Sequence, residues 1–336
     1  MRALVLDRPG PVARRPLALR ELPTPEPAAW ELRLRVSACA VCRTDLQIVT
    51  GDLPPHRSPV VPGHQGVGRG DAIGDGVAGW TLGDRAGVTW LGGFDGTCRF
   101  CREGRENLCP AATFTGWDRD GGYAEAITVR ADVAVHLASA LADDAAAPLL
   151  CGGVIGYRAL RLTGLAPDGL RSGGRLGLYG FGASALQAIQ VARHWGCEVH
   201  VASRSTADLD RATAFGAASV GAYDEPPPWP LDAAITFAPG GSVVVAALRA
   251  VDRGGTVVVN AIHLDGIPAF PYDDLWWERS IRSVANVTRR DAQEYLDLAA
   301  RIPVRTEVEV CPLADGNDAL ARLERGEIAG SAVLVA

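Results

Sequence analysis

A short strand, a glycine-rich turn and a helix follow one another in the second half of the chain, and this succession limits the fold more than any other feature. The apolar run Arg175–Tyr179 predicts a buried strand, and Gly180-Phe-Gly182-Ala-Ser-Ala185 then opens a helix with one apolar face. Further strands are expected at Glu198–Ala202, Leu231–Phe237, Gly255–Val259 and Ile281–Val284. Strands that alternate with helices predict an α/β fold with a doubly wound parallel sheet.

The first half of the chain has a different pattern. It is rich in Gly, Pro and short β-type runs such as Glu31–Val36, in which apolar and polar residues alternate. This pattern favours a small β-barrel ahead of the α/β region. At roughly 150 residues per domain, a chain of 336 residues has room for about two domains. A loop is expected at Pro226–Pro230 and a short helix at Asp318–Arg325.

Composition excludes several classes of protein. Hydrophobic residues make up 48% of the chain and charged residues 21%, which is typical of a folded globular protein. The 33 basic and 39 acidic residues give a net charge of −6 without any block of like charges, so a nucleic-acid partner is not expected. Every one of the 33 cationic side chains is arginine, which excludes catalysis by a lysine.

The segment that opens the chain and the cysteine content together indicate a reducing compartment. Met1–Asp7 contains too short an apolar run for a signal peptide, and no stretch approaches the ~18 apolar residues that span a bilayer. We therefore expect a soluble, cytoplasmic protein without a membrane partner. Its eight cysteines are then better interpreted as metal ligands or free thiols than as disulfides.

The turn after the first α/β strand has the spacing of a dinucleotide-binding fingerprint. Gly180 permits the tight turn, Gly182 lets the backbone approach a pyrophosphate, and Ala185 keeps the helix close to the strand. At the end of the next strand the chain reads Ser203-Arg204-Ser205, where an Asp or Glu would bind the ribose of NAD(H). An arginine flanked by hydroxyls favours a 2′-phosphate, so NADP(H) is the expected cofactor, and the alternative is a solvated surface arginine.

Three fragments in the first half bring Cys and His residues into a recognisable order. They are Cys39-Ala-Val-Cys42-Arg-Thr44-Asp45, Gly63-His64-Gln65-Gly-Val-Gly68 and Leu149-Leu-Cys151-Gly-Gly-Val. Together with Gly121-Gly-Tyr-Ala-Glu125 and the dinucleotide turn, they resemble the zinc-dependent alcohol dehydrogenases of the medium-chain dehydrogenase/reductase superfamily over essentially the whole chain.

The resemblance implies a fold and a set of catalytic-zinc ligands. The fold is a GroES-like β-barrel catalytic domain at 1–151, a Rossmann domain at 152–290 and a segment at 291–336 that returns to the catalytic domain. Cys42, His64 and Cys151 would hold the catalytic zinc, whose fourth position stays open for substrate oxygen. Buried packing residues are the alternative for these three side chains. Cys39 is expected to be structural, and Cys197 and Cys311 to be packing residues.

The family pattern also assigns roles to the residues beside the zinc ligands. Asp45 would accept the second ring N–H of His64, and the hydroxyl of Thr44 would pass the substrate proton. Gln65 and Gln47 depart from the pattern, because the family usually has a glutamate after the histidine and some members have a relay histidine in the second place. Arg43 is expected to help anchor the cofactor, since Ser331 stands where many relatives have an arginine.

A second cluster lies within about 91–112 and has the spacing of the family's structural zinc lobe. Asp95 takes the first of four positions that are normally cysteines, and Cys98, Cys101 and Cys109 take the others. A carboxylate oxygen can bind zinc, so an Asp/Cys₃ site with a second zinc is expected. The alternative is an Asp-Gly turn in a lobe without metal.

The resemblance therefore implies a zinc-dependent, NADP(H)-preferring alcohol dehydrogenase or aldehyde reductase that acts on a small-molecule alcohol or aldehyde, with Trp90 and Trp117 at the substrate pocket. Zinc would polarise the carbonyl and NADPH would deliver hydride. A homodimer or homotetramer is expected. Two alternatives stay open: a reductase of an activated C=C or C=N bond, and a dinucleotide-binding redox sensor without catalysis.

Overall fold

The chain folds into two compact units in a computed structural model that describes residues 1–169, 171–261, 264–302 and 304–336. The first unit consists of Met1–Val154 together with Asn286–Ala336, and the second consists of Ile155–Ala285. The chain thus leaves the first unit and later returns to it. The functional domains expected at 1–151, 152–290 and 291–336 stay a prediction. Among the described residues, no helix is both long and apolar enough to cross a membrane.

The second unit contains a parallel sheet whose strands, in the described residues, lie in the order β12-β11-β10-β13-β14-β15. Renumbered along the chain, this is the order 3-2-1-4-5-6 of a doubly wound dinucleotide-binding fold, so the α/β prediction is confirmed. The strands are β10 (Arg175–Tyr179), β11 (Glu198–Ala202), β12 (Ser219–Gly221), β13 (Leu231–Thr236), β14 (Val251–Val259) and β15 (Ser280–Ser283).

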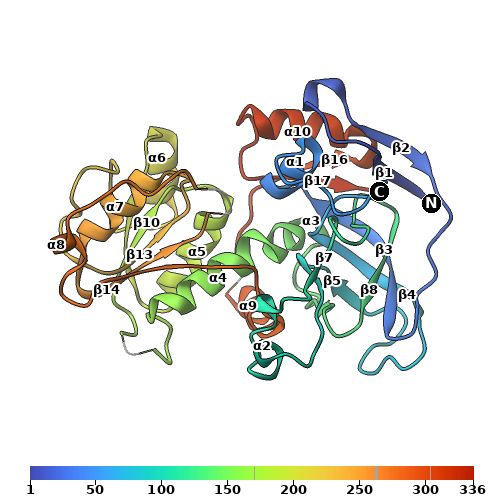
Figure 1. Ribbon diagram of the computed structural model, residues 1–336, viewed down its shortest axis with the longest axis horizontal. Coiled ribbons are helices and arrows are strands. Elements are labelled where there is room, and N and C mark those ends of the chain that lie inside the picture. The colour runs from blue at the N-terminus through green and yellow to red at the C-terminus, as the bar shows by residue number, and fades with distance from the viewer. Residues whose placement is uncertain (170, 262–263, 303) are drawn as a thin grey trace. The chain divides into compact units, whose positions relative to one another are not determined.

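Helices cover this sheet, which explains why its central strands are apolar on both faces. Figure 1 shows α5, α6 and α7 alongside the strands. In α5, the side chains of Leu186 and Ile189 are buried, as the apolar face of the sequence predicts. The helices are α4 (Gly152–Thr163), which starts in the first unit, α5 (Ala183–His194), α6 (Thr206–Ala214), α7 (Gly241–Ala250) and α8 (Tyr272–Leu275).

The first unit is built on a larger sheet in the order β16-β17-β3-β4-β5-β9, with β8 also paired to β3. β16 and β17 are parallel to each other, whereas the other pairs are antiparallel. The strands of this sheet are β3 (Glu31–Ala40), β4 (Gly66–Ile73), β5 (Arg85–Gly87), β8 (Ala126–Arg130), β9 (Val135–His136), β16 (Val308–Pro312) and β17 (Ser331–Val335). Two smaller ladders join β1 (Arg2–Leu6) to β2 (Leu17–Glu21) and β6 (Leu91–Gly93) to β7 (Thr113–Phe114).

Strand β3 is the centre of this unit, and it is longer than the sequence predicts. The strand contains the alternating segment Glu31–Val36 and continues through Ala40. The residues after Val36 are almost all buried, so they lack the alternation on which the prediction of a strand rested. β17 pairs with the end of β3, so the last segment of the chain completes the sheet. The helices here are α1 (Arg43–Thr50), α2 (Arg99–Arg102), α3 (Asp143–Ala146), α9 (Arg289–Arg301) and α10 (Gly316–Glu324).

Candidate metal centres and nucleotide pocket

Three elements of the first unit bring Cys42, His64 and Cys151 together. Cys42 is the N-cap of α1, His64 lies two residues before β4, and Cys151 lies between a 3₁₀ turn and α4. One ligand atom from each residue lies within 4.8 Å of those of the other two. Residues that are far apart in sequence thus form the cluster that the family pattern predicts, although their role as ligands stays a prediction.

The spacing of the donor atoms suits a tetrahedral zinc ion. Zinc–sulfur and zinc–nitrogen bonds of about 2.3 and 2.0 Å place neighbouring donors roughly 3.5 Å apart. Cys42 Sγ lies 3.4 Å from His64 Nε2. The N–H of Thr44 donates to Cys42 Sγ at 3.3 Å, which stabilises a thiolate at the start of the helix. Two sulfurs and one imidazole nitrogen fit zinc and leave a fourth position for another ligand.

A buried carboxylate fixes the orientation of His64. Asp45 is fully buried, and its Oδ1 lies 2.9 Å from His64 Nδ1. Its other oxygen accepts hydrogen bonds from the N–H of Cys42 at 2.9 Å and from the hydroxyl of Tyr123 at 3.0 Å. Nδ1 is therefore occupied, and Nε2 faces the two sulfurs. Sequence reasoning missed Tyr123, although it lies within the Gly121–Glu125 motif.

The three candidate ligands change one another's acidity. A hydrogen bond from Cys151 holds the pKa of the Cys42 thiol well below its ordinary value, and the charge of His64 acts in the same direction. The same hydrogen bond, together with burial, raises the pKa of Cys151. Burial alone would lower the pKa of His64, but Asp45 and Cys42 raise it well above its ordinary value. A divalent cation must displace these protons, so its binding weakens as pH falls.

Two polar atoms on α1 are buried without a hydrogen-bond partner among the described residues. They are Thr44 Oγ1 and Gln47 Oε1, which lie three residues apart and so on the same side of the helix. An unpartnered buried hydroxyl is costly in a folded protein, which is consistent with a ligand that completes the hydrogen bond. In contrast, Gln65 is satisfied by a hydrogen bond to the Ala40 carbonyl at 3.4 Å.

Aromatic side chains adjoin His64. The Trp90 ring lies edge-on to the imidazole at 5.0 Å between centroids, and it stacks with Phe114 at 5.1 Å and Trp117 at 5.9 Å. Trp117 in turn contacts the His56 ring, with the centroids 3.7 Å apart and the two planes tilted by 32°. Both predicted pocket tryptophans therefore belong to one aromatic cluster, which extends from a candidate ligand to a half-exposed histidine.

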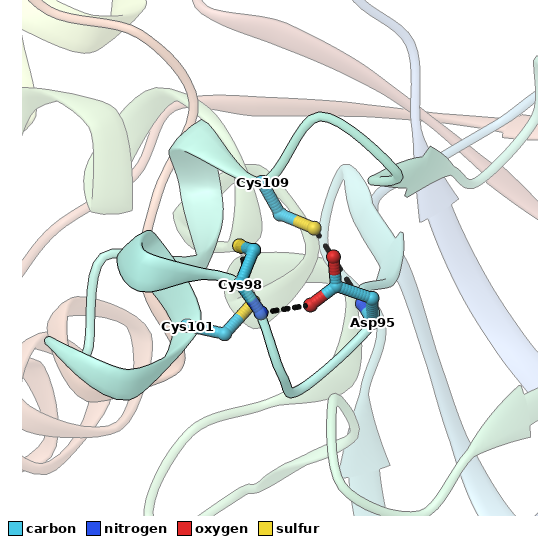
Figure 2. A group of neighbouring side chains, drawn as sticks. All are labelled: Asp95, Cys98, Cys101 and Cys109. Carbon is cyan, nitrogen blue, oxygen red and sulfur yellow. Dashed lines mark hydrogen bonds between the residues drawn. The ribbon is translucent and has the colours of Figure 1, made fainter.

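The second predicted cluster also assembles. Figure 2 shows Asp95, Cys98, Cys101 and Cys109 around a common centre, and their ligand atoms lie within 4.8 Å of one another. Cys98 Sγ lies 3.5 Å from Cys101 Sγ, and the N–H of Asp95 donates to Cys109 Sγ at 3.5 Å. The lobe thus offers three sulfurs and one carboxylate oxygen to a cation.

Asp95 has a second task in this lobe. Its Oδ1 accepts hydrogen bonds from the N–H groups of Thr97 at 2.7 Å and Cys98 at 2.8 Å, and these hold its pKa well below the ordinary range. Burial and Cys98 raise the pKa of Cys101 to about 12. The carboxylate is therefore ionised at neutral pH, and the proton that a metal must displace here is that of the thiol.

The glycine-rich turn of the second unit has the geometry that its spacing predicts. Gly180 has φ +94°, and a Cβ there would lie 2.9 Å from the Ala238 nitrogen. Gly182 is the N-cap of α5, and a Cβ there would meet nothing within 4 Å. The backbone at the N-cap of α5 is thus open to the close approach of a ligand, and a helix N-terminus favours an anion.

An open pocket of about 430 Å³ follows the strand β11, and five side chains line it. They include three of the predicted cofactor residues, Ser203, Arg204 and Ser205, and two that the sequence analysis missed, Asp208 and Tyr223. The pocket lies beyond the carboxyl ends of β11 and β12, where ligands bind in this fold. Of the other predicted cofactor residues, Ala185 is fully buried in α5, and Arg43 is exposed at the first position of α1 in the first unit.

Two known protein families match separate parts of the chain, and these parts correspond broadly to the two units. Residues 28–139 match the family described as "Alcohol dehydrogenase GroES-like domain". Residues 183–301 match the family described as "Zinc-binding dehydrogenase". The first match falls in the unit that contains both Cys clusters, and most of the second falls in the unit that contains the parallel sheet.

Individual relatives match over nearly the full length of the chain. The probable alcohol dehydrogenase AdhA of Mycobacterium tuberculosis (strain CDC 1551 / Oshkosh) is 48% identical, with coverage of 100% of this chain and 97% of the relative. The crystal structure of AibC matches with a TM-score of 0.91 and 28% identity, covering 100% and 95% of the two chains. A cobalt- and zinc-bound thermostable alcohol dehydrogenase from Pyrobaculum aerophilum gives a TM-score of 0.88 and 26% identity, with 100% and 99% coverage.

Proposed function

Because this chain belongs to the zinc-dependent alcohol dehydrogenase family of the medium-chain dehydrogenase/reductase superfamily, we propose that Cys42, His64 and Cys151 hold its catalytic zinc. As a member of this family it is an oxidoreductase that uses zinc and a nicotinamide cofactor. The observation that carries the assignment is the convergence of two sulfurs and one imidazole nitrogen, with Asp45 holding the imidazole from behind. The reaction is hydride transfer between NADP(H) and a small alcohol or aldehyde.

Several residues of the site have distinct roles in this reaction. When bound at Cys42, His64 and Cys151, a zinc ion would supply a Lewis acid for the substrate oxygen, and a bound nicotinamide would supply or accept hydride. Asp45 and Tyr123 keep the imidazole of His64 in one orientation. Thr44 Oγ1, buried and without a partner, donates a proton to the substrate oxygen during reduction and takes it back during oxidation. Gln47 has an amide that cannot titrate, so it cannot carry the proton onward, and water or the ribose of a bound cofactor would have to do so.

The zinc assignment is tested by the substitution Cys151→Ser. We expect carbonyl reduction to fall below detection, while the protein remains folded and still binds the dinucleotide. Cys311→Ser is the matched control, because Cys311 is a partly buried thiol of the same unit that lies outside both clusters. Metal content and activity are measured on both variants. Full activity of Cys151→Ser, or of protein stripped of metal, contradicts the assignment.

The preference for NADP(H) is supported by Arg204, which lines the pocket after β11 between two serines. A charge-assisted contact with phosphate contributes about 1.5–3 kcal/mol, which corresponds to roughly ten- to a hundredfold discrimination. We expect kcat/KM to favour NADPH over NADH on one substrate, and Arg204→Ala to remove that preference. Arg249→Ala, at an exposed arginine outside the pocket, serves as the control. Equal kcat/KM values for the two cofactors in the wild-type enzyme would refute the preference.

The remaining predictions concern the rest of the site and the assembly. A second zinc at Asp95, Cys98, Cys101 and Cys109, a pocket bordered by Trp90 and Trp117, a homodimer or homotetramer and a cytoplasmic location are all part of this proposal. The alternative reduction of a C=C or C=N bond is separated from it by product identification with paired saturated and unsaturated aldehydes. Family membership sets aside the sensor without catalysis.

A further inference from the structure

The pocket that follows β11 contains both a cation and a carboxylate. Arg204 is exposed on the loop, and Asp208 reaches the same pocket from the first turn of α6. In this fold a carboxylate at the ribose favours NAD(H), and an arginine favours NADP(H). Although residues 203–205 include no acidic side chain, Asp208 therefore places a carboxylate at the same pocket.

The hydrogen bonds around Asp208 show that it does not act as a helix cap. Ser205 and Asp208 have the spacing of a capping box, in which the carboxylate would accept the N–H of Ser205. That N–H instead donates to Ser203 Oγ at 3.2 Å, and Ser203 Oγ donates to Asp208 Oδ2 at 3.1 Å. Arg211 lies 3.5 Å from the other carboxylate oxygen. The side chain is thus held at the wall of the pocket by Ser203 and Arg211.

The two remaining side chains of the pocket add hydrogen-bonding groups without charge. Tyr223 stacks its ring on Tyr179 with 6.4 Å between centroids, which fixes the phenol at the wall of the pocket. Ser205 is exposed and accepts the N–H of Asp208 at 3.3 Å. Hydroxyl groups serve a ribose and a phosphate equally well, so they do not decide between the two cofactors. The two charged side chains of the pocket, Arg204 and Asp208, are the ones that can discriminate between NAD(H) and NADP(H).

We infer that Asp208 is a specificity-determining residue that opposes the 2′-phosphate, so the cofactor preference of this enzyme is a balance between Arg204 and Asp208. The inference rests on the proposal that this pocket holds the cofactor ribose. Because Asp208 and Arg204 line the same pocket of about 430 Å³, a 2′-phosphate bound beside Arg204 would also be near the Asp208 carboxylate, and like charges repel. The same carboxylate can accept a hydrogen bond from the free 2′-hydroxyl of NAD(H).

The test compares Asp208→Asn with Asp210→Asn. Both variants remove one negative charge from α6, but Asp210 is exposed and does not line the pocket. The substitution at Asp208 preserves the shape of the side chain, so thermal unfolding should change little. The probes are 2′-AMP, which carries its phosphate on the 2′ oxygen, and 5′-AMP, which has a free 2′-hydroxyl. Their binding requires neither zinc nor turnover. Their dissociation constants are measured by calorimetry at low and high salt.

We expect Asp208→Asn to tighten the binding of 2′-AMP about three- to tenfold relative to that of 5′-AMP at low salt, and less at high salt. Asp210→Asn should change this ratio less than twofold. With whole cofactors, the kcat/KM ratio of NADPH to NADH should rise in the same proportion. An unchanged ratio in Asp208→Asn, or an equal change in Asp210→Asn, overturns the inference.

The outcomes distinguish this inference from the proposed function. The wild-type enzyme could show no preference for NADPH while Asp208→Asn shifts the kcat/KM ratio toward NADPH. In that case Arg204 and Asp208 do oppose each other, and only the proposed preference of the wild type is wrong. If 2′-AMP binds equally well to wild type and to Arg204→Ala, the pocket does not hold the ribose. In that case the assignments of Arg204 and Asp208 both fail, while the zinc assignment stands.

Discussion

At the scale of single residues, Thr44 has the most revealing surroundings. Its Oγ1 is buried and has no hydrogen-bond partner among the described residues, although it lies on the helix that Cys42 begins. A buried hydroxyl without a partner costs about 1–3 kcal/mol. A protein retains such a group where a ligand uses it, which is a common form of the conflict between stability and activity.

We therefore expect Thr44→Val to have opposite effects on activity and stability. Valine has nearly the shape of threonine but no hydroxyl, so the free energy of unfolding should stay the same or rise by up to about 1 kcal/mol. The rate of hydride transfer should fall by about 10²- to 10⁴-fold, because the proton donor is lost. Denaturant unfolding and single-turnover reduction measure the two quantities. Thr44→Ser, which retains the hydroxyl, should keep most of the activity, and a large loss of stability in Thr44→Val would contradict this account.

At the scale of elements, the lobe around α2 raises the question of whether Asp95 binds metal or only closes a turn. Its Oδ1 accepts two backbone N–H groups, so Asp95→Ala would remove the turn and the metal ligand together. Asp95→Asn separates the two roles, because an amide oxygen still accepts both hydrogen bonds but is a poor zinc ligand. Asp95→Cys does the reverse and creates a four-cysteine site.

If Asp95 is a ligand, we expect the wild-type enzyme to contain two zinc ions per chain and Asp95→Asn to contain one. The midpoint of thermal unfolding should fall in Asp95→Asn, with little change in kcat, and Asp95→Cys should restore both zinc ions. Elemental analysis of protein dialysed without chelator measures the zinc content. A single zinc in the wild type that disappears in Cys151→Ser would mean that the lobe binds no metal and that Asp95 is a turn residue.

Most strands of the second unit were predictable from the sequence because local patterns set them, whereas β12 was not expected and β14 starts four residues earlier than predicted. The bounds of β10 and β11 agree with the expected strands, since apolar runs end at Gly, Ser or a turn. Long-range contacts were not predictable in this way. Tyr123 reaches Asp45 across 78 positions, and Asp208 enters the pocket because α6 begins at Thr206, immediately after the N-cap Ser205. No local pattern carries the information about which distant side chains meet.

At the scale of the whole molecule, Asp143 joins three elements of the first unit. It lies at the start of α3, accepts a hydrogen bond from Ser37 of β3 at 2.6 Å and pairs with Arg85 of β5. Burial opposes ionisation, but Ser37 and Arg85 outweigh it and lower the pKa of the carboxyl. A group whose pKa is lower in the folded state stabilises the fold above its unfolded pKa, near 4, and loses that contribution at lower pH.

We expect Asp143→Asn to be less stable than wild type by about 1 kcal/mol at pH 7, a modest value because the pair is partly exposed. The difference should shrink as pH falls below about 4, where the wild-type carboxyl also becomes protonated. Urea unfolding of both proteins between pH 3 and pH 7 measures the difference directly. Asp144→Asn, at the neighbouring carboxylate, is the control, and a difference that does not depend on pH would refute the charge-based explanation.

The return of the chain to its first unit sets an order of events during synthesis. β3 ends at Ala40, and its partner β17 starts only at Ser331, roughly 290 residues later. At about 5–20 residues per second, a ribosome needs on the order of 15–60 s to make the intervening chain. Throughout that time Ala38–Ala40, the end of β3, lacks the partner that β17 later provides, although β8 already pairs with Glu31–Arg35. An unpaired strand edge invites association with other chains. The second unit, 155–285, is fully synthesised before β17 appears. The first unit therefore starts to be synthesised before the second unit but is completed after it.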